Sequence, residues 1–85
     1  MRKEVEVRLA GGLEARPIAV LVQVASQYES SIYLEADGKR VNAKSIMGMM
    51  TMTLKAGEKL VVEATGSDEA AAVEGIEKYI SGQEA

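Results

Sequence analysis

The chain has 85 residues, of which 47% are hydrophobic and 27% are charged, so its length predicts one domain over residues 1–85. It contains neither cysteine nor histidine, which excludes a disulfide framework, thiolate chemistry and phosphate transfer through an imidazole. A net charge of −3, with three tyrosines as the aromatic residues, argues against direct binding of nucleic acid.

The first ten residues alternate between charged and apolar side chains, with Val5, Val7 and Leu9 on one side. This period of two predicts a half-buried strand over residues 3–9. The segment lacks the continuous apolar run of a signal peptide, and no stretch reaches the about 20 apolar residues of a membrane span. We therefore expect a cytoplasmic protein.

A helix is expected next, from about Arg16 to Tyr28. Gly11-Gly12 ends the strand, and Pro17 follows at a position typical of a first helical turn. The apolar residues recur at helical spacing, and the expected buried side comprises Ile18, Ala19, Leu21, Val22 and Ala25.

Two short strands and a short helix follow Ser30-Ser31. Residues 32–35 alternate in polarity, and Asp37-Gly38 is a dipeptide typical of a tight hairpin turn. Residues 39–43, centred on Val41, are expected to pair back as the next strand. Ser45 then precedes the run IMGMMTMTL, whose length and methionine content favour a short helix over a strand.

The last strand and helix complete the order β-α-β-β-α-β-α. Residues 60–64 predict a fourth strand, and Asp68 and Glu69 suit the N-terminus of a helix, whose dipole favours negative charge. The expected buried stripe of that helix comprises Ala71, Ala72, Val73, Ile76, Tyr79 and Ile80. This order predicts an α+β fold, a two-layer sandwich with helices on one face of a sheet.

The segment GLEARP, residues 12–17, is the first candidate site. A helix that begins after a glycine pair exposes backbone N–H groups that bind anions, and Arg16 could add a bidentate donor. The alternative, which the pattern favours, is that Glu14 caps the helix and Arg16 is solvated. One glutamate without a partner acid, histidine or metal ligand predicts no catalytic residue, metal or cofactor, and hence no enzyme.

Ser45 and the residues after it form the second candidate site. A serine at this position caps a helix, and a phosphoserine would bring a charge of about −1.5 to −2 to the same place. Ile46, Met47 and Met50 are the candidate apolar contacts for a partner, since methionine suits adaptable binding surfaces. We expect Met49 or Met52 to be buried and Met47 and Met50 to be partly exposed. Lys44 could offset an added phosphate.

Several segments together resemble the HPr family, the small phosphocarrier proteins of the bacterial sugar phosphotransferase system. They are GLEARP at 12–17, IAVLVQVASQYES at 18–30, IYLE at 32–35, KSIMGMM at 44–50 and GSDEAAAVEGIEKYI at 66–80. The resemblance implies an HPr-like open-faced sandwich, a four-stranded antiparallel sheet with three helices on one face. The family pattern at the first site is G-x-H-A-R-P, so Glu14 occupies the position of the phosphocarrier histidine and forms a degenerate site.

The resemblance implies a regulatory role for the second site. Ser45 falls on the serine that HPr kinase/phosphorylase modifies in Gram-positive bacteria, and a chain that keeps this serine without the histidine is similar to the catabolite-repression branch of the family. Its phosphorylated form is then expected to bind the catabolite control protein, a LacI-family regulator, through Arg16, Ile46, Met47 and Met50. A phosphocarrier-like component of the phosphotransferase system and a ferredoxin-like ligand-binding domain are the alternatives. A monomer and a homodimer formed by exchange of the first strand both remain open.

Overall fold

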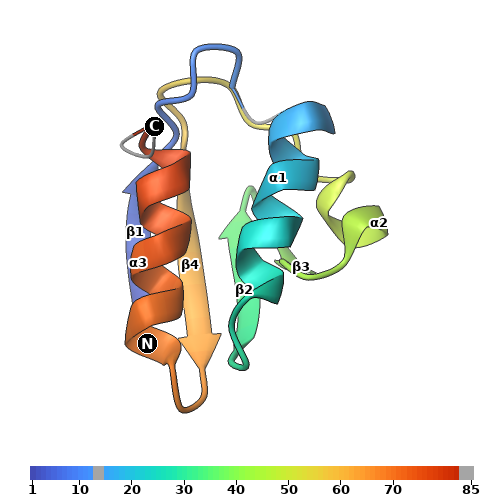
Figure 1. The fold of residues 1–85 in the computed structure, drawn as a ribbon. Helices are drawn as coiled ribbons and strands as arrows, with labels where there is room; N and C mark the ends of the chain where they lie inside the picture. The colour runs from blue at the N-terminus through green and yellow to red at the C-terminus, as the bar shows by residue number, and fades with distance from the viewer. Residues whose placement is uncertain (13–14, 83–85) are drawn as a thin grey trace.

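The computed structural model describes residues 1–12 and 15–82 and contains the predicted order of elements (Figure 1). These are β1 (Arg2–Glu6), α1 (Ala15–Ser26), β2 (Ser31–Ala36), β3 (Lys39–Asn42), α2 (Ile46–Met49), β4 (Lys59–Thr65) and α3 (Glu69–Ile80). Among the helices of the described residues, none has the length and apolar character needed to cross a bilayer.

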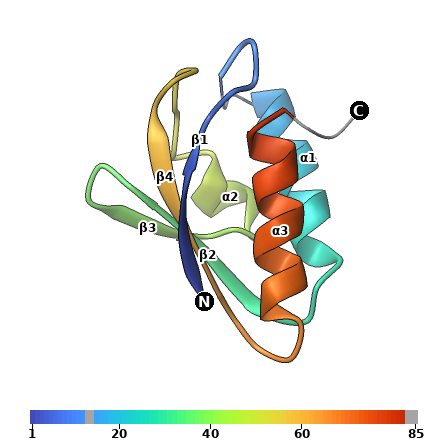
Figure 2. The same ribbon diagram turned by 90° about the vertical axis from the view of Figure 1, so that its left-hand side faces the viewer.

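The strands of the described chain form one four-stranded sheet in the order β1-β4-β2-β3, and every neighbouring pair is antiparallel. The helices lie together on one face of this sheet, and the other face is open (Figure 2). β4 shows why the layers form: Leu60, Val62 and Ala64 are buried, and the residues between them point to the open face. The predicted α+β open-faced sandwich is confirmed.

Each long helix buries a narrower stripe than the sequence predicts. The buried residues are Ile18, Leu21, Val22 and Ala25 of α1 and Ala72, Val73, Ile76 and Ile80 of α3. Ala19 and Ala71 were expected inside but are exposed, and Tyr79 is half-buried. One residue turns a helix by about 100°. A small alanine at the margin of the stripe therefore faces water at little cost.

The boundaries of β1 and α1 differ from the predicted ones because the backbone finds other partners. β1 ends at Glu6, although the amide of Val7 still donates to the carbonyl of Glu58 at 2.8 Å. The amide of Arg8 then donates to the carbonyl of Ile80 at 2.9 Å, which directs the chain to the end of α3. α1 ends at Ser26 because the next two amides bond three residues back instead of four.

The β2–β3 hairpin turns at the predicted dipeptide. Asp37 and Gly38 have φ angles of 52° and 76°, as a two-residue type I′ turn requires. β3 ends at Asn42, one residue before the predicted end, and the amide of Ala43 still donates to the carbonyl of Ile32 at 2.9 Å. This register places the start of α2 immediately after the edge of the sheet.

Candidate functional site

Ser45 is the N-cap of α2. Its backbone is extended, with φ −108° and ψ 113°, and its carbonyl accepts the first helical bond from the amide of Met49 at 2.9 Å. The Ser45 hydroxyl accepts a hydrogen bond from the amide of Gly48 at 3.2 Å. The side chain therefore satisfies one of the amides that a helix start leaves without a partner. Ser45 is half-buried, so part of the residue is accessible to solvent.

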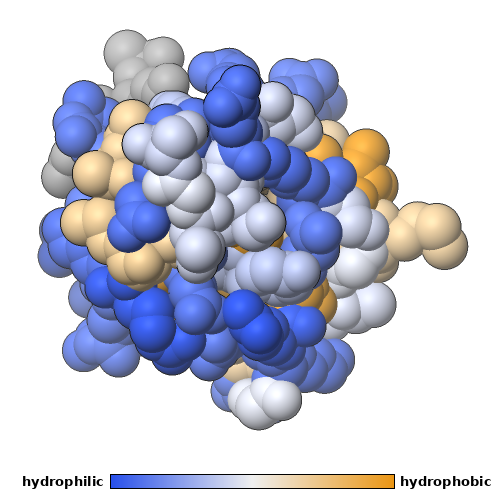
Figure 3. All heavy atoms as spheres, turned by 90° about the horizontal axis from the view of Figure 1, so that it is seen from below, coloured by the Kyte–Doolittle hydropathy of each residue, from blue (hydrophilic) through white to orange (hydrophobic). Residues whose placement is uncertain are grey.

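Three apolar side chains beside Ser45 are exposed to solvent, and we call them the apolar patch: Ile46, Met47 and Met50. Their exposed fractions are 53%, 84% and 52%, whereas Met49 and Met52 are 0% and 3% exposed. Figure 3 shows apolar side chains standing out on the right-hand side of the molecule, the side on which α2 lies in Figure 1. A helix of a single turn can bury only one side, so the predicted division of the methionines is confirmed.

Lys44 anchors the residues that enter α2. Its ammonium group donates to the carbonyl of Tyr28 at 2.6 Å, and its amide donates to Oδ1 of Asn42 at 2.8 Å. The carbonyl of Tyr28 lies just past the end of α1, where carbonyl groups lack helical partners and attract a cation. The Lys44 side chain of the unphosphorylated chain is therefore directed at α1, and its role in offsetting a phosphate on Ser45 stays a prediction.

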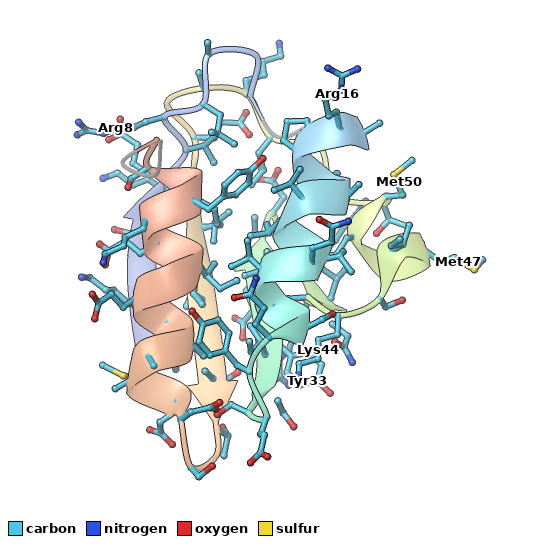
Figure 4. The ribbon with its side chains drawn as sticks, in the orientation of Figure 1. Arg8, Arg16, Tyr33, Lys44, Met47 and Met50 are labelled. Atoms are coloured by element: carbon cyan, nitrogen blue, oxygen red, sulfur yellow. The ribbon has the colours of Figure 1, made fainter. Side chains whose placement is uncertain are left out.

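Arg16 stands on the first turn of α1, and its side chain is exposed. In Figure 4 it points away from the end of α1, and Met50 and Met47 project from α2 on the same side of the molecule. α1 and α2 pack against each other, which brings Arg16 and the apolar patch to one surface. Glu14, the other candidate of the first segment, lies outside the described residues.

The open face of the sheet carries a charge network that no sequence pattern predicts. Nη1 of Arg2 lies 2.9 Å from Oε2 of Glu35, and Nη2 of Arg40 lies 2.7 Å from Oε1 of Glu63. The hydrogen bond from Arg2 holds the pKa of Glu35 below its usual value. The guanidinium of Arg40 also lies over the ring of Tyr33, 4.2 Å from its centre. Cross-strand register creates these pairs, and the sequence alone does not show it.

The acidic residues of the described ranges do not gather into a metal site. No group of three or more aspartate and glutamate side chains among residues 1–12 and 15–82 is placed to hold a metal ion. The surface formed by Arg16, Ser45 and the apolar patch instead combines a cation, a hydroxyl and exposed apolar groups. This combination suits recognition by a protein partner.

Comparisons with known proteins agree with this fold. A family model described as "PTS HPr component phosphorylation site" matches residues 1–82. The HPr-like protein Crh of Bacillus subtilis strain 168 is 46% identical over 80 residues, which cover 94% of each chain. Phosphocarrier protein HPr of Bacillus anthracis strain Ames superposes with a TM-score of 0.90 at 42% identity, covering 94% of this chain and 95% of that one. The crystal structure of Bacillus subtilis Crh, an intertwined dimer with a swapped domain, superposes with a TM-score of 0.77 at 46% identity and covers 94% of this chain and 92% of that one.

Proposed function

This chain belongs to the HPr family, and we propose that it is a regulatory member that signals through Ser45. In this proposal HPr kinase/phosphorylase transfers the γ-phosphate of ATP to the Ser45 hydroxyl. The phosphorylated chain then binds the catabolite control protein, a LacI-family regulator, as its corepressor in carbon catabolite repression. The regulator contacts DNA, and this chain acts on the regulator in the cytoplasm.

The observation that carries the proposal is the position of the Ser45 hydroxyl, at the first turn of α2 and directly beside the apolar patch. A phosphate on this oxygen would bring a charge of about −1.5 to −2 and three acceptors. The positive end of α2 tolerates that charge, so phosphorylation would leave the helix in place. Modification would then add an anionic group directly beside the apolar patch.

Two kinds of contact would follow on the regulator. Basic groups would bind the phosphate, and each charge-assisted hydrogen bond contributes about 1.5–3 kcal/mol. Ile46, Met47 and Met50 would bury apolar surface against the partner, while Arg16 would meet an acidic group at the edge of the contact. The unphosphorylated chain keeps the apolar contacts alone, which makes the phosphate the switch.

A phosphocarrier role is the alternative function, since the family also includes phosphocarrier proteins. Sequence identity does not separate the two roles, because Crh and the Bacillus anthracis HPr are 46% and 42% identical to this chain. The carrier chemistry of the family uses a histidine, and this chain contains none. We propose that Glu14 at that position uncouples the chain from sugar transport and leaves serine phosphorylation as its input.

The test is incubation of the full chain with HPr kinase/phosphorylase and ATP, followed by mass spectrometry and titration with the regulator. We expect one phosphate on Ser45 and binding that is about tenfold to a hundredfold tighter than before phosphorylation. Ser45→Asn is the matched variant, because asparagine caps a helix as well as serine and offers no hydroxyl. Tight binding by Ser45→Asn after the same treatment would contradict the proposal.

Phosphoenolpyruvate-dependent labelling distinguishes the alternative. A carrier would take phosphate from the first enzyme of the phosphotransferase system. A phosphate on a carboxylate such as Glu14 would be released by hydroxylamine, whereas phosphoserine would persist. We expect no such labelling in this chain.

The dimeric structure of Bacillus subtilis Crh supports a homodimer as a second assembly of this chain. Size-exclusion chromatography with light scattering at increasing concentration tests it. We expect the molecular mass to rise toward that of two chains.

A further inference from the structure

Methionine is the sulfur-containing residue of this chain, which has five methionines and no cysteine. Four of them, at positions 47, 49, 50 and 52, lie in α2 and directly after it. Met47 and Met50 are 84% and 52% exposed, while Met49 and Met52 are 0% and 3% exposed. Neighbouring residues of one segment therefore differ sharply in their access to a dissolved oxidant.

We infer that Met47 and Met50 are a peroxide-sensitive modification site that makes the apolar patch polar. The thioether sulfur of each residue attacks one oxygen of hydrogen peroxide, and the O–O bond breaks as the S–O bond forms. Sulfur loses two electrons, peroxide gains them, and the second oxygen leaves as water with both protons. The product is methionine sulfoxide, which is polar and which cells can reduce again.

Exposure is the reason that oxidation would be selective and would leave the fold intact. Susceptibility of methionine follows its access to solvent, so Met49 and Met52 would react when the protein opens. Met47 buries little surface that a sulfoxide would have to desolvate. The amide of Met50 donates to the carbonyl of Ile46 at 2.9 Å, and this backbone bond at the C-cap does not involve the sulfur.

The consequence rests on the proposed function, because the apolar patch is the surface that would bind the regulator. Two of its three side chains would become polar, and only Ile46 would remain apolar. Oxidation would then oppose phosphorylation, since one modification adds the anchoring charge and the other removes the apolar contact.

The first experiment treats the full chain with dilute hydrogen peroxide and follows each methionine over time. Trypsin cleavage after Lys44 and Lys55 places all four methionines in one peptide, residues 45–55, in which tandem mass spectrometry locates each added oxygen. We expect Met47 and Met50 to react about tenfold faster than Met49 and Met52, with rates similar to that of exposed Met1. In concentrated urea the four rates should converge. Equal rates in the folded protein would overturn the inference.

The second experiment measures the surface and the fold without any partner. Oxidised protein should keep its circular dichroism spectrum and urea midpoint but elute earlier from a hydrophobic interaction column. The control is the double variant Met47→Leu and Met50→Leu, which keeps apolar side chains of similar volume at both positions. Its retention should change much less than that of the parent on the same treatment, because Met1 is the exposed methionine that both proteins keep. Unfolding of the oxidised parent, or unchanged retention, would contradict the inference.

Titration of the regulator with chain phosphorylated on Ser45 separates the inference from the proposed function. Absence of binding before oxidation contradicts the proposed function, and the first two experiments still decide the inference. We expect binding that weakens several-fold after Met47 and Met50 are oxidised and that does not weaken in the double leucine variant. Binding that is as tight after oxidation as before would show that the modification has no regulatory effect.

Discussion

The carboxylate of Asp68 receives two hydrogen bonds from Ser30, one from the amide at 2.9 Å and one from the hydroxyl. It also accepts a hydrogen bond from the amide of Glu29 at 2.9 Å. Asp68 is the N-cap residue of α3, yet its side chain makes no capping bond to that helix. It instead joins the turn between α1 and β2 to the start of α3, a connection between residues far apart in sequence.

Asp68 should make the stability of the protein depend on pH in the acid range. The hydroxyl of Ser30, followed by the Glu29 amide, lowers the pKa of Asp68 in the folded state. The stabilisation is therefore complete above about pH 4, where an unfolded aspartate titrates, and is lost as pH falls through the lower folded value. We expect Asp68→Asn to unfold at a lower urea concentration than the parent at pH 7. Between about pH 4 and 2, the urea midpoint of the variant should fall less than that of the parent.

The matched control for this prediction is Asp37→Asn in the hairpin turn. Asparagine tolerates the positive φ of 52° at that position, so the variant should keep the parent's urea midpoint at pH 7. Two variants with the same midpoint at pH 7 would show that the contacts of Asp68 do not stabilise the fold.

Gly12 should not accept a side chain, whereas Gly11 should. A Cβ on Gly12 would lie 2.6 Å from the carbonyl oxygen of Leu54, and the φ of +75° disfavours any L side chain. A Cβ on Gly11 would meet no heavy atom within 4 Å. We expect Gly12→Ala to lower the free energy of unfolding by about 1–3 kcal/mol or more and Gly11→Ala to change it little, as measured by urea denaturation. Equal losses of unfolding free energy in the two variants would show that Gly12 does not pack closely against the backbone at Leu54.

Gly75 in α3 makes room for Tyr28. A Cβ on Gly75 would collide with the Tyr28 hydroxyl and lie 2.9 Å from Cζ of its ring. Gly75→Ala should therefore destabilise the parent by about 1–3 kcal/mol, as overpacking does. In a Tyr28→Ala background the same change should stabilise by about 1 kcal/mol, the difference in helix propensity between the residues. Thermal denaturation of the four proteins of this double-mutant cycle measures the effect of Gly75→Ala on stability in each background. The same effect in both backgrounds would contradict the contact between Gly75 and Tyr28.

Lys44 should stabilise the junction between α1 and α2. Replacing it with methionine removes the ammonium group 2.6 Å from the Tyr28 carbonyl while it keeps a long apolar side chain. We expect a loss of about 1 kcal/mol in the free energy of unfolding, since the bond is charged but only partly buried. Lys55→Met, at an exposed position, is the control and should have little effect. A loss of the same size in both variants would indicate a general effect of charge.

Much of this architecture follows from local patterns in the sequence. The alternation around Val5 and Val62 is a property of each strand alone, and the positive φ angles of Asp37 and Gly38 are what such a dipeptide favours. The apolar run after Ser45 indicated a short helix, and its single turn explains which methionines are exposed. These features depend on residues close in sequence, where backbone geometry leaves few choices.

Contacts between residues far apart in sequence could be identified only from the folded structure. The hydrogen bond from Ser30 to Asp68 joins residues 38 positions apart, and the one from Lys44 to the carbonyl of Tyr28 joins residues 16 positions apart. Neither contact was predicted from the sequence. No local sequence pattern showed that Ala19 and Ala71 face water. The sequence by itself therefore determined the elements, the hairpin and the candidate serine. Tertiary structure decided the partners of the charged groups and the surface shared by α1 and α2, because register and packing bring these residues together and neither is encoded in a local pattern.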